Sequence, residues 1–439
     1  MCSANTSPLD PIFRSYERQL NIRRKVILLL LILAPYLAGA SGFAIVSATP
    51  DSGKFLSNTS ASANSNKKGN LTSTFGLHDI LTFDITEQAG KLHLLVGGKK
   101  SVDSKRLTLR YLQYNHDDKQ WHLVATLNEK LPETIASRGN DVQIAAHDDR
   151  LVALWQTKGE LPGVGSMISA YSTDAGKTWQ RGGNPGKHAE DINEAYIDLA
   201  ADTKGHFHVA WLSDPLENGY QSLYYSHSRD YGKSWIEPVL LDNSTCACCW
   251  NRLIRTPDDQ LFVLYRDSQP RDMALIQSHD YGNSWQHRGH VGKFQWEFSG
   301  CPHIGGGLSH NGQKNSPGLH AIVWTGQESS SGLRYLGSTD NGHSWTKIRT
   351  FGETTLNGDI AGRENNVAAV WNQMEAEGLS VYVAKSGDGG LTWSQPELIA
   401  EATRATVHPK IIATQTGFIV LWTENPTGKT SQIGWHIIE

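Results

Sequence analysis

A short motif recurs along the chain at nearly regular intervals, and it constrains the fold more than any other feature. The motif is S-x-D-x-G-x-[S/T]-W, and it occurs five times: STDAGKTW (172–179), SRDYGKSW (228–235), SHDYGNSW (278–285), STDNGHSW (338–345) and SGDGGLTW (386–393). A degraded copy, NHDDKQW, ends at Trp121. Successive motif tryptophans lie roughly 50 to 60 residues apart, which is the length of one four-stranded blade of a β-propeller.

The residue types of the motif suit a tight turn. The aspartate carboxylate can accept hydrogen bonds from the amides of its own turn, and the glycine can take a positive φ. Serine or threonine adds a second side-chain bond, and the tryptophan can wedge between neighbouring blades. We therefore expect the motif aspartates to be structural: Asp174, Asp230, Asp280, Asp340 and Asp388.

This motif is the Asp-box, or BNR repeat, and over residues 76–439 the chain resembles the sialidase superfamily. The resemblance implies a β-propeller whose boxes lie on hairpins away from the active site. It also implies six blades, the number in sialidases.

A second repeat favours seven blades. It consists of a short strand, a turn and an apolar strand that often ends in tryptophan, as in NDVQIAAHDDRLVALWQ, and it occurs seven times. The last copy begins at His408 and reaches the C-terminus with three strands and no box, so a strand from before His78 would complete it. Closure of this kind removes open sheet edges. We predict an all-β, seven-bladed Asp-box propeller over residues 76–439, with six blades as the alternative.

Three segments precede the propeller. Residues 1–25 form a basic tail, and residues 26–46 are an apolar run without charge, about long enough to span a bilayer. Basic residues before such a run indicate a cytoplasmic N-terminus, so we interpret the run as a transmembrane anchor. The alternative is a signal segment cleaved near Ala40, after which the protein would be secreted. Residues 47–75 are rich in Ser, Asn and Thr and are expected to be a flexible linker.

This order of segments predicts a propeller outside the cytoplasm, periplasmic or extracellular, with the membrane as a partner through the apolar run. The formal net charge is -4, and no basic patch marks a nucleic-acid surface.

Polar residues are expected around the propeller axis, because the first strand of each blade lines the central channel. Aligning the seven modules on their first buried aliphatic residue predicts an axial ring of Asp79, Gln143, Asp198, Arg252, His303, Asp359 and Lys410. Its uniformly polar character indicates a wet, functional channel, although a solvated channel without a ligand is the alternative. The candidate ligand-binding residues are Arg138, Asp141, Gln143, Arg252, His303, Asp359, His408 and Lys410.

Four of the five cysteines lie in two short stretches at the starts of adjacent blades, NSTCACCWNR and SGCPHIGGG. The fold should bring Cys246, Cys248 and Cys249 close to Cys301 and His303. Structural disulfides are one interpretation, because thiols outside the cytoplasm tend to oxidise. A copper(I) or zinc site is the second, with His408 as a further candidate ligand. Ordinary core packing is the third.

The resemblance to sialidases also implies a catalytic apparatus: an arginine cluster for the substrate carboxylate, an acid/base carboxylate, and a tyrosine nucleophile activated by glutamate. The candidates are Asp79, Asp198, Glu194, Tyr196 and Arg252. However, the Arg-Ile-Pro element of the family is absent, and GLHDILTF stands in its place. We therefore predict a glycan or envelope ligand at the axial mouth without true sialidase activity. A copper- or zinc-handling protein and a divergent glycoside hydrolase of exo-sialidase type are the alternatives.

Overall fold

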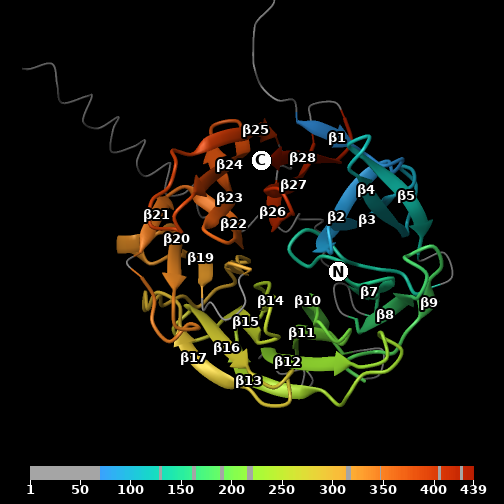
Figure 1. Ribbon diagram of the computed structural model, residues 1–439, viewed down its shortest axis with the longest axis horizontal. Helices are drawn as coiled ribbons and strands as arrows, with labels where there is room; N and C mark the ends of the chain where they lie inside the picture. The colour runs from blue at the N-terminus through green and yellow to red at the C-terminus, as the bar shows by residue number, and fades with distance from the viewer. Residues whose placement is uncertain are drawn as a thin grey trace, which may run out of the picture. The chain divides into compact units, whose positions relative to one another are not determined.

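The computed structural model describes residues 70–439 apart from 128–130, 161–164, 188–191, 215–220, 313–317, 347, 404–406 and 426–428. Within these residues seven four-stranded antiparallel sheets are arranged as blades around a central axis (Figure 1). The prediction of an all-β, seven-bladed propeller is confirmed, and the six-bladed alternative is wrong. Residues 1–25, residues 26–46 and most of the predicted linker lie outside the described residues.

The strands follow one another in chain order from the axis outwards in blades one to six. Blade one contains β2 (Asp79–Gln88), β3 (Lys91–Lys99), β4 (Leu107–Asn115) and β5 (Gln120–Thr126). Blade two contains β6 (Gln143–His147), β7 (Arg150–Gln156), β8 (Met167–Ser172) and β9 (Gln180–Arg181). Blade three contains β10 (Glu194–Ala201), β11 (Phe207–Ser213), β12 (Gln221–Ser228) and β13 (Val239–Thr245). Blade four contains β14 (Arg252–Arg255), β15 (Leu261–Arg266), β16 (Met273–Ser278) and β17 (Gln286–His290).

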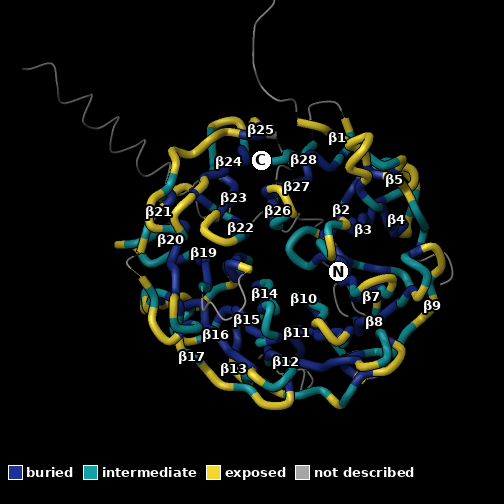
Figure 2. The backbone as a smooth tube through the Cα atoms, viewed as in Figure 1, coloured by how far each residue is buried: buried dark blue, intermediate teal, exposed yellow. Residues whose placement is uncertain are grey.

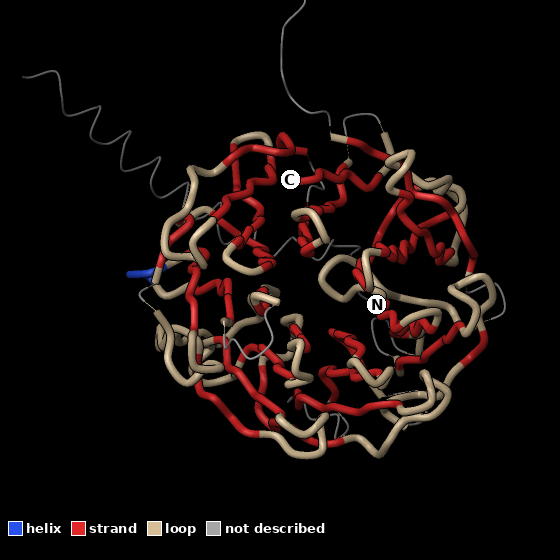
Figure 3. The backbone as a smooth tube through the Cα atoms, in the orientation of Figure 1, coloured by secondary structure: helices blue, strands red, loops and turns tan. Residues whose placement is uncertain are grey.

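The later blades repeat this order. Blade five contains β18 (Gly306–His310), β19 (Leu319–Thr325), β20 (Gly332–Ser338) and β21 (Arg349–Gly352). Blade six contains β22 (Thr355–Arg363), β23 (Asn366–Glu375), β24 (Gly378–Ser386) and β25 (Glu397–Thr403). Blade seven contains β26 (Val407–Ala413), β27 (Phe418–Glu424), β28 (Gln432–Ile438) and, at its outer edge, β1 (Leu71–Ser73). A 3₁₀ turn, η1 (Glu328–Ser330), interrupts the strands and loops (Figure 3).

Blade seven closes the ring with both ends of the described chain. β1 pairs antiparallel with β28, where Leu71 lies opposite Trp435. The expected closing strand is therefore present, and its residues, Leu71–Ser73, lie in the last part of the predicted linker. Pairing the first strand with the last leaves no blade incomplete, which protects the sheet edges.

The hydrophobic core lies between blades as much as within them. One buried cluster joins Leu95 and Leu109 of blade one to Ile144 and Trp155 of blade two, and similar clusters follow around the ring. Tryptophans of the second strands are fully buried, namely Trp155, Trp211, Trp371 and Trp422. Figure 2 shows buried backbone within the blades and exposed segments mainly at the connecting turns.

Each Asp-box carboxylate binds its own turn. In the box of blade three, the Asp230 carboxylate accepts hydrogen bonds from the backbone N of Ser234 at 2.9 Å and from its hydroxyl at 2.6 Å. The other four boxes repeat this pair of bonds. The box tryptophans pack across blade boundaries as expected: Trp285 of blade four meets Tyr225 of blade three edge-on, at 4.7 Å between ring centroids.

Among the described residues, no helix has the length and apolarity needed to cross a bilayer.

Candidate metal centre and axial site

Seven residues occupy the same position in the first strands, each opposite an aliphatic residue of the second strand. The strand registers place them as Asp84, Gln143, Asp198, Arg252, Gly307, Asp359 and Lys410. Five agree with the ring aligned from sequence. The alignment was wrong in blades one and five, where Asp84 replaces Asp79 and Gly307 replaces His303.

Irregular strand starts explain both differences. β2 begins at Asp79, five residues before the axial position, and has a register shift between Ile80 and Thr82. The Asp79 carboxylate accepts a bond from the backbone N of Ser431 at 3.1 Å instead. In blade five the strand begins only at Gly306, so His303 stays in the preceding loop.

Three axial aspartates link neighbouring blades. Asp84 accepts a hydrogen bond from the backbone N of Ile144 at 2.9 Å, and Asp359 accepts one from Ile411 at 3.1 Å. Asp198 accepts the corresponding bond from Leu253. Each carboxylate thus accepts a hydrogen bond from a first-strand amide of the next blade, which links the two blades in the ring.

The axial cations are paired with these and nearby carboxylates. Lys410 Nζ lies 2.7 Å from Asp84, and a guanidinium nitrogen of Arg252 lies 3.8 Å from Asp359. Arg138 pairs with Asp141 and also donates to the carbonyl oxygen of His408. Each cation therefore has its own acidic partner, unlike the arginines of a cluster built to bind a substrate carboxylate.

Burial shifts the pKa values of two groups near the axis, Asp198 and His408. It raises the pKa of Asp198 to about 6, because the neighbouring Arg252 offsets the lost hydration only in part. Burial also lowers the pKa of His408 to about 3, helped by the charge of Arg138. His408 is therefore neutral at pH 7, and its ring lies 4.8 Å from that of Trp250.

Two cavities lie at opposite ends of the first strands. The smaller has a volume of about 60 Å³, and its lining includes seven of the eight predicted ligand-binding residues, all except His303. The larger, about 440 Å³, is lined by the C-terminal halves of the first strands and shares Asp198 and Arg252 with the smaller.

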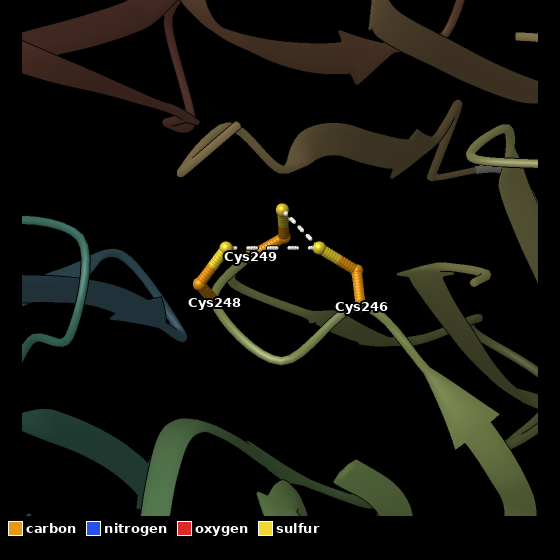
Figure 4. Close-up of side chains that lie close together, drawn as sticks. All are labelled: Cys246, Cys248 and Cys249. Atoms are coloured by element: carbon orange, nitrogen blue, oxygen red, sulfur yellow. Dashed lines mark hydrogen bonds between the residues drawn. The ribbon is translucent and has the colours of Figure 1, made fainter. Parts of the chain in front are cut away.

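The cysteines form a compact cluster beside the axis. The loop from β13 to β14 carries Cys246, Cys248 and Cys249, and their side chains point toward one another (Figure 4). The sulfur of Cys246 lies 3.0 Å from that of Cys249 and 3.7 Å from that of Cys248. All three residues are buried, with exposed fractions of 1%, 4% and 1%. Tyr196 packs against the cluster.

A second group of donors adjoins the first. Cys248 also belongs to a set with Cys301 and His303 whose ligand atoms all lie within 4.8 Å of one another, as do those of the three clustered cysteines. Cys301 is exposed. The five predicted metal ligands are thus brought together, whereas His408 packs against Trp250 and belongs to neither group.

Arg266, at the end of β15, connects the two loops that carry these donors. Its backbone carbonyl accepts a bond from the amide of Cys246 at 2.9 Å. Its buried guanidinium donates to the carbonyl oxygens of Ile304 and Trp324, both at 2.9 Å, and to that of Arg271. Arg266 is not among the residues predicted from the sequence. An arginine that ends a fully apolar strand, as in LFVLYR, is a signal that could have identified it.

The remaining catalytic candidates, Glu194 and Tyr196, do not form a nucleophile–base pair, because each contacts different groups. The Glu194 carboxylate is fully buried and accepts a bond from the backbone N of Met167 at 2.7 Å. Tyr196 has a positive φ of 55° and faces the cysteines instead. A register shift between Ala195 and Asp198 separates the directions of these two side chains.

Comparisons with solved structures agree with the fold. The chain is similar to an ulvan lyase of polysaccharide lyase family PL25, solved bound to -[GlcA(1-4)Rha3S]-, with TM-score 0.54 and 12% identity over 82% of this chain and 95% of that one. It is also similar to polysaccharide lyase Uly1, with TM-score 0.52 and 9% identity over 80% and 88%. Trypanosoma rangeli sialidase matches with TM-score 0.44 and 11% identity over 82% and 55%.

No protein-family model matches the sequence, and neither does any curated protein. At 9–12% identity, the similarities to the two lyases place the chain among the β-propellers at the level of fold.

Proposed function

We propose that this propeller binds copper(I) through the cysteine cluster at the junction of blades three, four and five. One observation carries the proposal: five sulfur and nitrogen donors from two loops, 55 residues apart in sequence at Cys246 and Cys301, meet beside the axis. Thiolates are soft ligands that select copper(I) and zinc over harder ions.

The geometry of the buried group suits a three-coordinate ion. Three sulfurs placed symmetrically about 2.3 Å from one ion would lie about 4 Å from one another. The Cys246–Cys248 separation of 3.7 Å is close to this value, whereas the Cys246–Cys249 separation of 3.0 Å must widen when an ion binds. Zinc in structural sites takes four ligands, whereas the buried group supplies three, so monovalent copper is the better match. The charge of Arg266 partly offsets that of the thiolates.

A disulfide is the competing state of the same residues. The 3.0 Å between the sulfurs of Cys246 and Cys249 exceeds a disulfide bond of about 2.05 Å but needs only a small movement to reach it. Outside the cytoplasm, where we propose that the 26–46 segment holds the propeller, metal binding would keep these thiols from oxidising. Protease accessibility of the propeller in intact cells tests that placement.

The proposed function is tested by copper(I) titration of the full-length, reduced chain against a chromophoric chelator in the absence of oxygen. We expect a sub-nanomolar dissociation constant for copper(I) in the parent chain. The affinity of Cys246→Ser/Cys249→Ser should be at least a hundredfold weaker. Cys2→Ser is the matched control and should bind as the parent chain does. Copper retention that is equally weak in all three proteins would contradict the proposal.

A glycan remains a second candidate ligand. The polar cavity of about 440 Å³ on the axis could hold a short oligosaccharide, and a lyase with a similar fold was solved with an acidic one. Calorimetry with uronate oligosaccharides tests this binding, and Arg255→Ala, at the cavity wall, should weaken it. A fluorogenic sialoside should not be cleaved.

A further inference from the structure

The five donors of the cysteine cluster do not form one coordination sphere. They fall into two groups, Cys246, Cys248 and Cys249 in the first, and Cys248, Cys301 and His303 in the second. Two donors that bind one ion at about 2.3 Å cannot be more than about 4.6 Å apart. The five ligand atoms do not all lie within 4.8 Å of one another, so a single ion cannot bind all five in this arrangement.

Cys248 is the residue that the two groups share. A thiolate sulfur has more than one lone pair and can bind two ions at once, so both groups can be filled together. Each ion would then have three donors, one of them in common. The first group is purely sulfur, and the second combines two sulfurs with an imidazole, which suits copper or zinc.

The two groups differ in access to solvent. The cysteines of the first group are at most 4% exposed, whereas Cys301 of the second is exposed. An ion in the first group is enclosed by protein, while an ion in the second can be reached by a chelator or by a protein that delivers or receives metal.

We infer that the site holds two copper(I) ions bridged by Cys248: an inner ion on Cys246, Cys248 and Cys249 that is retained, and an outer ion on Cys248, Cys301 and His303 that exchanges. This inference rests on the proposed function and specifies how many ions bind and which of them is transferable. Arg266 fixes the two donor-bearing loops relative to each other, because its carbonyl oxygen accepts a bond from the Cys246 amide and its guanidinium donates to the Ile304 carbonyl.

The test is copper(I) stoichiometry of the full-length chain by native mass spectrometry, followed by challenge with excess bathocuproine disulfonate. We expect two equivalents in the parent chain, of which one is removed at least tenfold faster than the other. Cys301→Ser/His303→Ala should bind one equivalent and lose the fast phase. Cys2→Ser and the surface variant His122→Ala are matched controls and should keep two equivalents.

X-ray absorption provides a second readout that does not depend on affinity. Short copper–copper scattering should appear in the parent chain at two equivalents and be absent from Cys301→Ser/His303→Ala. If the double variant is unstable, Cys301→Ser alone replaces it in both measurements, because Cys301 is exposed.

The outcomes separate the inference from the proposed function. A parent chain that binds one equivalent, unchanged in Cys301→Ser/His303→Ala, would overturn the two-ion site while leaving copper binding intact. Two equivalents in both proteins would also overturn it. A parent chain that binds no copper(I) would refute the proposed function itself.

Discussion

Arg266 donates a hydrogen bond from Nε to the carbonyl oxygen of Ile304 over 2.9 Å, across the boundary between blades four and five. Arg266 is 1% exposed, and its guanidinium donates two further hydrogen bonds, to the carbonyl oxygens of Arg271 and Trp324. A planar fork of donors makes this arrangement possible, and the ammonium of a lysine cannot reproduce it.

Arg266→Lys should therefore destabilise the fold and loosen the loop that carries Cys301. We expect a loss of about 2–4 kcal/mol in the free energy of unfolding, because a buried charge is left with unsatisfied partners. Chemical denaturation measures it. Arg255→Lys, a partly exposed residue 3.6 Å from Asp259, is the control and should cost less than about 1 kcal/mol. Equal costs for both variants would refute the bracing role.

The adjacent glycines of the blade-six Asp-box differ in what lies beside them. Both have positive φ, 72° at Gly389 and 88° at Gly390. A Cβ at Gly390 would lie 1.8 Å from the hydroxyl of Tyr335 in blade five, whereas one at Gly389 would meet nothing within 4 Å. Gly389→Ala should cost about 1–2 kcal/mol through backbone strain alone.

Gly390→Ala should lower the free energy of unfolding by about 1–3 kcal/mol more than Gly389→Ala does, because Tyr335 and its blade must also move. Thermal unfolding of the two variants side by side measures the difference. Indistinguishable melting temperatures would show that the box does not press against the preceding blade.

Glu194 should make stability depend on pH. Burial raises its pKa to about 7, despite the hydrogen bond from the Met167 amide. A carboxyl group with a raised folded-state pKa favours the folded state most below its unfolded pKa of about 4.3, and this contribution is lost as pH rises through 7. Glu194→Gln should thus leave stability nearly unchanged at pH 4.5 and raise it by about 1–3 kcal/mol at pH 8.

Chemical denaturation of Glu194→Gln across this pH range checks the prediction. Glu237→Gln, at a side chain 81% exposed, should show no such trend. A gain for Glu194→Gln that is constant with pH would exclude titration of this carboxyl group as the cause.

Arg252 should be needed to hold the axial carboxylates. Its removal in Arg252→Met leaves Asp198 and Asp359 buried without their cation, and we expect a loss of about 3–5 kcal/mol at pH 8. The loss should shrink at pH 5, because the pKa of Asp198 is already raised to about 6 and the group then takes up a proton. Adding Asp198→Asn should restore part of the stability at pH 8. If the loss in Arg252→Met is the same at pH 5 and pH 8, and Asp198→Asn does not reduce it, this explanation is wrong.

Local chemistry explains why much of the fold was predictable. In each Asp-box, the aspartate, glycine and hydroxyl residue act within one turn, as Asp230 and Ser234 do, so the motif has the same structure wherever it occurs. Seven strand modules follow from a hydrophobic pattern of the same local kind. Even closure by a strand before His78 followed from the missing fourth strand of the last module, and β1 supplies it.

The axial ring was less predictable because it depends on register. Asp84 and Gly307 replace Asp79 and His303, because a strand can start early or late without changing its pattern of buried residues. Register is set by pairing with the second strand and by bulges, and neither is visible in one segment alone.

The sequence by itself determined the repeat, favoured seven blades over six, and predicted the meeting of two cysteine-bearing loops, because each follows from turn chemistry and from the order of repeats along the chain. Only the tertiary structure decided that the donors divide into two groups around Cys248, that the axial charges are paired, and that Arg266 joins the loops. These features depend on distances between side chains of different blades, and such distances exist only after the ring has closed.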